Sequence, residues 1–113
     1  MARDSKPLPA ASLHVVLALL DGELHGYALM RRVADISGGA VRMGPGTLYG
    51  TLNRLVGDGL IIETTDRVSR DEAERRRYYE LTADGRAVAL DELARLNTLV
   101  SRIGGHLAGG ATS

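Results

Sequence analysis

The chain has 113 residues, 44% of them hydrophobic and 25% charged, and its 14 basic residues balance 14 acidic ones. This length supports one soluble domain with a modest core and excludes two independent cores, while the zero net charge gives no global support for nucleic-acid binding. Cysteine is absent, which excludes disulfides and thiolate chemistry, and no apolar run reaches the roughly 20 residues of a membrane span or resembles a signal-peptide core, so a cytoplasmic protein is expected.

The N-terminal third of the chain predicts two scaffold helices. Residues 1–8 are polar and end in a Pro-Leu-Pro segment, so a flexible arm is expected there. Ser12 is expected to cap a helix that runs to residue 22, and a second helix is expected over residues 25–39, with glycines at its end. The apolar side chains that should face the core are Leu13, Val16, Leu17 and Leu20 in the first helix and Leu29, Met30, Val33 and Ile36 in the second.

A third helix is predicted from Gly44 to Asp58, since a Gly-Pro pair places proline at its first position. Stepping about 100° per residue separates two unlike faces. The side predicted to pack carries Pro45, Leu48, Leu52, Leu55 and Val56, and the opposite side carries Gly46, Thr47, Gly50, Asn53, Arg54 and Gly57. The second side is small and polar, as the recognition helix of a helix-turn-helix requires. An ordinary amphipathic surface helix is the simpler alternative.

A β-hairpin is predicted directly after the third helix. Gly59 stops the helix, residues 60–65 and 77–82 have strand composition, and residues 66–76 between them have no apolar periodicity. Alternation along the second strand sends one of Tyr78 and Tyr79 inward. A helix-turn-helix followed by a hairpin is a winged helix, whose wing usually lies along a phosphate backbone or in a minor groove. The cations of this wing, interspersed with acidic residues, are Arg67, Arg70, Arg75, Arg76 and Arg77.

Thr82 can cap a final helix, which is expected to end near Ile103, before a Gly-Gly pair. Within it an apolar seam repeats at spacings of 4, 3, 4 and 3 residues, formed by Ala89, Leu93, Leu96, Val100 and Ile103. A heptad seam of this kind faces another helix. It is too short for a free coiled coil but long enough for a dimer interface supported by other surfaces.

These elements predict a mainly helical fold with a small β-hairpin, an α+β winged helix-turn-helix with a C-terminal dimerisation helix. The expected boundaries are a flexible arm at 1–8, the winged helix-turn-helix at 9–82, the dimerisation helix at 83–103 and a disordered tail at 104–113. Neither an enzyme nor a cofactor is expected, because there is no nucleophile and base set and no lysine-bearing nucleotide loop. The histidines, His14, His25 and His106, lack partners at metal-ligand spacing.

Three blocks in fixed order carry a family resemblance: HGYAL at 25–29, GPGTLYGTLNRLVGDGLI at 44–61 and RRYYELTADGR at 76–86. With these blocks the chain resembles the PadR-type transcriptional regulators, and its single C-terminal helix is similar to the short subfamily. The resemblance implies a winged helix-turn-helix, a C-terminal dimerisation helix and a homodimer that represses transcription by binding double-stranded DNA at an inverted-repeat operator.

The resemblance also implies which residues contact DNA. The GTLY motif places Thr47 and Tyr49 at the start of the recognition helix, where the Tyr49 ring can pack while its hydroxyl reaches a phosphate. Tyr27 either anchors to the DNA backbone or packs its ring under the wing. One or two of the wing arginines are expected to meet phosphate. The full expected contact set is Tyr27, Gly46, Thr47, Tyr49, Gly50, Thr51, Asn53, Arg54, Arg67, Arg70, Arg75, Arg76 and Arg77.

A small-molecule effector is left open. Some PadR-like proteins bind aromatic compounds in a pore at the dimer interface, where tryptophan stacks the ligand, but this chain has neither tryptophan nor phenylalanine. A pocket here would have to use Leu13, Val16, Leu17, Leu93, Leu96 and Val100 or their neighbours, a stripe that is better explained as plain core and dimer seam. Two alternatives stay open beside the repressor: a winged-helix protein-interaction module without DNA binding, suggested by the zero net charge and acid-rich wing, and a regulator of another winged-helix family such as MarR.

Overall fold

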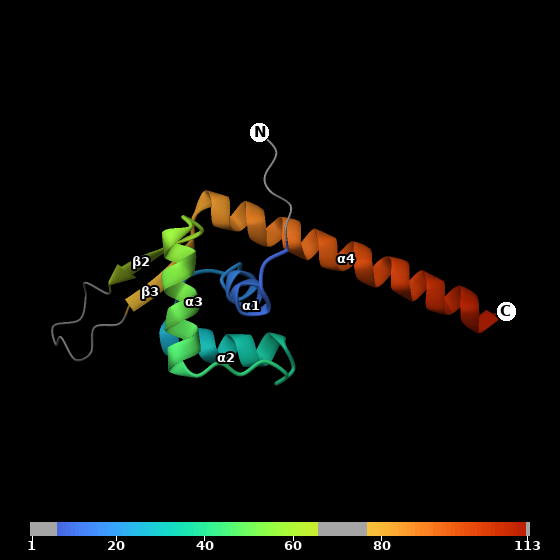
Figure 1. Ribbon diagram of the computed structural model, residues 1–113, viewed down its shortest axis with the longest axis horizontal. Coiled ribbons are helices and arrows are strands. Elements are labelled where there is room, and N and C mark those ends of the chain that lie inside the picture. Colours follow the sequence, from blue (N-terminus) through green and yellow to red (C-terminus); the bar gives the residue numbers. More distant parts are fainter. Residues whose placement is uncertain (1–6, 66–76, 113) are drawn as a thin grey trace.

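The computed structural model describes residues 7–65 and 77–112, which contain four helices and three short strands (Figure 1). In chain order they are α1 (Ala10–Ala18), β1 (Leu24–His25), α2 (Gly26–Ile36), α3 (Pro45–Gly57), β2 (Ile61–Thr65), β3 (Arg77–Leu81) and α4 (Ala83–Thr112). This order confirms the predicted winged helix-turn-helix followed by a long C-terminal helix. Within these residues no helix combines the length and apolar character needed to cross a membrane.

α1 is the central helix and packs against α2, α3 and α4. Its Val15 and Val16 are fully buried, in one core cluster with Leu29 of α2 and Leu52 of α3. A helix that meets three neighbours must be apolar on most of its surface, which explains why α1 lacks a polar face.

α1 begins earlier than predicted, at Ala10, because Pro9 precedes it as the N-cap with an extended backbone (φ −55°, ψ 153°). The Pro9 carbonyl accepts the first helical hydrogen bond from the Leu13 N–H at 2.9 Å. The prediction that Ser12 caps this helix is wrong, since Ser12 lies inside the first turn and is buried against the core.

α2 begins where the sequence predicts, and His25 caps it: its Nδ1 accepts a hydrogen bond from the Ala28 N–H at 3.3 Å. Leu29 and Val33 are buried, as predicted. Ile36 is 41% exposed, so the prediction that it faces the core is wrong. It lies in the last turn of α2, beyond Val33, the last buried position of the helix.

The sheet is antiparallel, with strand order β1-β3-β2. β2 and β3 pair in the register Ile61↔Leu81, which confirms the predicted hairpin, and its tip at residues 66–76 lies outside the described residues. β1, which pairs Leu24 with Tyr79, was not predicted. Two residues are too few to produce the alternating pattern by which a strand is recognised.

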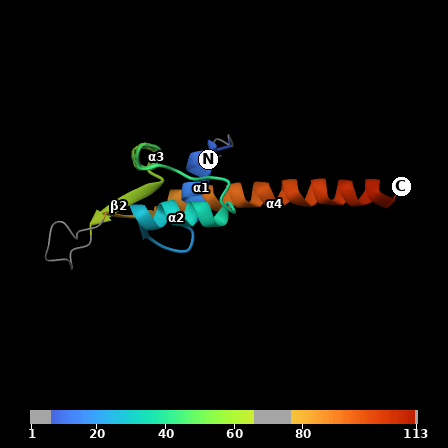
Figure 2. The same ribbon diagram turned by 90° about the horizontal axis from the view of Figure 1, so that it is seen from below.

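α4 is capped by Thr82, whose Oγ1 accepts a hydrogen bond from the Gly85 N–H at 2.9 Å. The helix continues to Thr112, so the predicted end near Ile103 and the disordered tail from residue 104 are wrong. Gly104 and Gly105 do not adopt the positive φ by which glycine ends a helix. Glycine in a helix costs about 1 kcal/mol relative to alanine but does not forbid helix. The C-terminal half of α4 therefore extends well beyond the rest of the domain (Figures 1 and 2).

Candidate nucleic-acid interface

The outer face of α3 is open and nearly free of bulky side chains. Figure 2 shows this helix at one surface of the domain, with β2 beside it. A Cβ atom added at Gly46, Gly50 or Gly57 would meet no other atom within 4 Å. The bareness is therefore not forced by crowding within the chain, and a partner can approach the helix backbone closely. The exposed residues of this face are Gly46, Thr47, Gly50, Asn53, Arg54 and Gly57, as predicted.

The opposite side of α3 fixes its rotation in the domain. Leu48, Leu52 and Leu55 are all essentially buried in the core. Pro45 and Val56, which were predicted to pack beside them, are exposed. They occupy the two ends of the helix and lie about 60° and 80° from Leu48 around its axis, at the border of the buried side.

Thr51 does not lie on the outer face, although the family motif suggested a DNA contact there. It is 8% exposed, and its hydroxyl donates to the Thr47 carbonyl within α3 at 2.8 Å. Counting about 100° per residue places Thr51 about 40° from Leu55, which is buried, so Thr51 lies beside the packed leucines of α3. We therefore correct the expected contact set by removing Thr51.

Tyr49 connects the recognition helix to the start of α2. A Cβ atom at Gly26 would overlap the Tyr49 hydroxyl oxygen and lie 3.0 Å from its Cζ, so the phenol occupies the space that this glycine leaves. Tyr49 nevertheless remains 40% exposed. Both halves of the prediction for this residue, a packed ring and an accessible side chain, are compatible with this position.

Tyr27 lies on the surface at the first turn of α2. It is 63% exposed, which contradicts the alternative in which its ring packs under the wing. The guanidinium Cζ of Arg31, one turn later, lies 5.9 Å from the centre of its ring, within range of a cation–π interaction. Arg31 was not among the residues expected to contact DNA, and its i,i+4 spacing to the tyrosine was the feature that could have identified it.

The base of the wing carries a chain of polar contacts. Tyr79, which is 2% exposed, donates a hydrogen bond to Glu63 Oε1 at 3.3 Å, and Arg77 Nε lies 3.6 Å from Glu63 Oε2. Burial, followed by the Glu63 charge, raises the pKa of Tyr79 to about 12. Tyr79 therefore stays protonated as a donor to Glu63, while Arg77 remains largely exposed at the point where the wing leaves the sheet.

The other wing tyrosine, Tyr78, alternates to the opposite face of the sheet and is half-buried. Its ring meets His25 edge-on, with centres 5.7 Å apart and an interplanar angle of 88°. With Tyr79 buried, as the alternation predicts, and Tyr78 packed on His25, both tyrosines form part of the framework of the wing. The arginines predicted for the wing tip, Arg67, Arg70, Arg75 and Arg76, lie outside the described residues.

The predicted seam of α4 divides into two parts. Ala89 is fully buried in its own domain, where the first turns of α4 pack on α1. The prediction that Ala89 contacts a partner is therefore wrong. Val100 and Ile103 are 69% and 51% exposed, and Leu93 is 38% exposed. The same side of the helix thus serves the core in its first turns and is uncovered where the helix leaves the domain.

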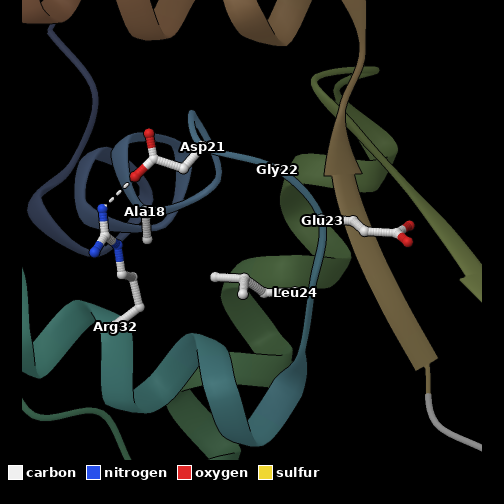
Figure 3. Close-up of a pocket in the computed structure, with 6 residues that line it drawn as sticks. All are labelled: Ala18, Asp21, Gly22, Glu23, Leu24 and Arg32. Carbon is white, nitrogen blue, oxygen red and sulfur yellow. Dashed lines mark hydrogen bonds and ion pairs between the residues drawn. The ribbon is translucent and has the colours of Figure 1, made fainter.

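A small open hollow of about 200 Å³ lies between the end of α1 and α2 (Figure 3). Arg32 and Asp21 form an ion pair across it, with Nη2 and Oδ2 2.5 Å apart. Its lining is Ala18, Asp21, Gly22, Glu23, Leu24 and Arg32, and includes none of the residues predicted to form an effector pocket.

The comparison that decides the family is with a family model described as the transcriptional regulator PadR-like family, which matches residues 16–91. The chain belongs to this PadR-like family. It is therefore a transcriptional regulator and not an enzyme. A transcriptional regulator of Mycobacterium tuberculosis is 35% identical to this PadR-like chain over 106 residues, which cover 91% of this chain and 94% of that protein.

Solved PadR structures share the fold. A PadR family transcription regulator from Clostridium difficile aligns with a TM-score of 0.71 at 19% identity, over 88% of this chain and 99% of that one. Bacillus subtilis PadR, solved in complex with operator DNA, aligns with a TM-score of 0.66 at 23% identity, over 77% of this chain and 48% of that one. At these identities both likenesses bear on the fold alone.

Proposed function

We propose that this PadR-like regulator is a homodimeric, cytoplasmic repressor that binds an inverted-repeat operator, with α3 in the major groove and the wing along the phosphate backbone. The observation that carries the proposal is the open outer face of α3, where three glycines leave room for a groove to approach. Thr47 and Asn53 are the polar side chains suited to base edges, and Arg54, late in the helix, is suited to a phosphate.

The proposed contacts extend beyond α3 to the surfaces beside it. Tyr27 and Arg31 at the start of α2 present a hydroxyl and a guanidinium to the solvent, and both groups commonly bind phosphate oxygens. Arg77 contributes a cation at the wing base. Bacillus subtilis PadR, whose fold this chain shares, was crystallised with operator DNA, which supports the proposal that this chain binds DNA. The wing-tip arginines remain predictions.

The proposed dimer uses the projecting half of α4. Leu93, Val100 and Ile103 continue the side of the helix that packs on α1 but are exposed, and nothing else in the described chain covers them. A second copy presents the same seam in return, so the two helices can bury it by pairing. Pairing two copies also brings two recognition helices to one duplex, as an inverted repeat requires.

Effector control, if it is part of this regulator, is proposed to act by changing the separation of the two recognition helices. A ligand shifts such an equilibrium only by binding one arrangement more tightly than the other. Leu13, Leu17 and Leu96 are only partly buried, so a second copy of α4 could enclose a pocket beside them.

The competing function is a winged-helix module that binds another protein and not DNA, favoured by the zero net charge. A fluorescence-anisotropy titration against the DNA upstream of the regulator's own gene, at two salt concentrations, separates the two. The repressor predicts competable binding that weakens steeply with salt, because phosphate contacts release counterions. Absence of competable binding at low salt would favour the protein-interaction module.

The double variant Thr47→Ala, Arg54→Ala tests the assigned face. Both residues are exposed, and among the described residues Arg54 has no ion-pair partner, so the fold should be retained. A lost base contact costs about 1–3 kcal/mol, which predicts at least about a fivefold loss of affinity. Arg102→Ala, on the side of α4 away from the seam, is the control for removing one positive charge. Unchanged affinity in the double variant would refute the face assignment.

A further inference from the structure

The first turn of α4 is fitted directly onto the end of the recognition helix. Thr82 Oγ1 donates a hydrogen bond to the Gly59 carbonyl at 2.7 Å, and the Thr82 N–H donates one to the Leu60 carbonyl at 3.0 Å. The same hydroxyl accepts the Gly85 N–H at 2.9 Å. We call these four residues, Gly59, Leu60, Thr82 and Gly85, the α3–α4 joint.

Gly85 shows how closely α4 approaches the turn that follows α3. A Cβ atom at this position would overlap the Leu60 carbonyl oxygen and lie 2.8 Å from the Leu60 carbonyl carbon. The obstacle is backbone, which cannot move aside as a flexible side chain can. Gly85 does not have a positive φ, so the space available, and not the backbone conformation, requires glycine here.

The other side of the joint is equally fixed, because α3 ends in a closed hydrogen-bonded turn. Gly59 has a φ of +76°, its N–H donates to the Val56 carbonyl at 3.0 Å, and the Leu60 N–H donates to the Leu55 carbonyl at 3.0 Å. This is the Schellman arrangement, which pins the two residues after a helix to its last turn. The two carbonyls that Thr82 contacts are therefore held in a constant position relative to α3.

We infer that the α3–α4 joint sets the operator spacing that this regulator accepts, with Thr82 and Gly85 acting as positioning residues that need not touch DNA. In a dimer paired through α4, the position of each recognition helix relative to the twofold axis depends on how α3 is attached to α4. The joint supplies a short and rigid attachment at this point. This inference rests on the proposed function.

Operator spacing is a sensitive measure of this attachment. Adding one base pair between half-sites moves them about 3.4 Å apart and turns one relative to the other by about 35°. A dimer with rigid joints should bind one spacing well, whereas a dimer with loosened joints should discriminate less between spacings. A mutation that only lowered stability would weaken binding to all spacings alike.

The experiment uses the full chain. The first duplex is an inverted repeat that the wild-type protein selects from a random-sequence library. Two further duplexes have one base pair added or removed between its half-sites. Thr82→Val removes the hydroxyl contacts while keeping the side-chain shape. Thr82→Ser keeps the hydroxyl and is the matched control. Gly85→Ala pushes α4 away from the Leu60 carbonyl. Sedimentation at each protein concentration verifies that all the variants remain dimers.

The wild type and Thr82→Ser are expected to prefer the selected spacing by about tenfold or more. Thr82→Val, which loses two hydrogen bonds, is expected to lose about tenfold on the selected duplex and less on the other two, so that its preference shrinks. Gly85→Ala, where it folds, should shift the preferred spacing. The inference is overturned if folded, dimeric Thr82→Val prefers the selected duplex over the other two by the same factor as the wild type does. If the wild type binds no duplex, the proposed function fails first.

Discussion

Replacing Tyr79 with phenylalanine tests the polar link at the base of the wing. The ring of Tyr79 is buried in the core, and its hydroxyl donates to Glu63 at 3.3 Å. Phenylalanine preserves the packing and removes one hydrogen bond, worth a net of about 1 kcal/mol in unfolding free energy. Glu63 keeps Arg77 and solvent as partners, so no unpaired buried carboxylate adds to this cost.

At high pH the same substitution should stabilise the protein relative to the wild type and not destabilise it. The pKa of Tyr79 is raised from 10.0 to about 12, so the folded state holds the phenolic proton more tightly than the unfolded state does. The stability this contributes is complete below pH 10 and is lost as the pH rises from 10 through 12. Two pKa units correspond to about 3 kcal/mol, of which roughly half is lost by pH 11. The variant has no phenol here and loses nothing by this route.

The expected result is a crossing of two stability curves. The wild type is more stable than Tyr79→Phe by about 1 kcal/mol at pH 8, and the two become equal near pH 11. Urea unfolding followed by circular dichroism, at one fixed protein concentration because a dimer's stability depends on it, measures the difference at each pH. Parallel curves from pH 8 to 11 would show that Tyr79 is not protonated more tightly in the folded state, and would refute this account of the wing base.

Three further changes have expected outcomes. Val100→Glu with Ile103→Glu places charges on the exposed seam. The dimer dissociation constant measured by sedimentation should rise at least about 100-fold, and operator affinity should fall in parallel. An unchanged dissociation constant would place the dimer interface elsewhere. Gly26→Ala should lower unfolding free energy by about 1–3 kcal/mol, because the Tyr49 phenol fills that space, and combining it with Tyr49→Ala should relieve the cost if this is the cause. Gly105→Ala, which meets no neighbour, should raise helicity and stability by up to about 1 kcal/mol; a decrease would contradict an α4 that is helical there.

The parts of the fold that could be predicted are those marked by local backbone chemistry. Gly38, Gly39 and Gly59 end their helices with positive φ, and Pro45 opens α3, so the limits of α2 and α3 followed from sequence. Gly104 and Gly105 also suggested a helix end in the sequence, but neither glycine has a positive φ in the structure. A glycine pair permits a helix to end but does not require it.

The parts of the site that escaped prediction depend on contacts between distant segments. Tyr79 meets Glu63 across the sheet, and Gly85 meets Leu60 from the neighbouring helix, so neither pairing leaves a periodic trace in the sequence. Thr51 is a different case, because the family motif suggested a DNA contact for a side chain that lies beside the buried leucines of α3. A motif identifies a segment, while the direction of each side chain still has to be taken from the helix that carries it.

The seam of α4 illustrates how one uninterrupted pattern can serve two purposes. Ala89 and Val100 lie on the same side of the helix at heptad spacing, yet the first is fully buried and the second is 69% exposed. The pattern records only that this side avoids water, whether it is covered by α1 or by another chain. The difference arises where α4 passes the edge of the domain, so Leu93, which is partly exposed near this transition, should contribute less to dimer affinity than Val100.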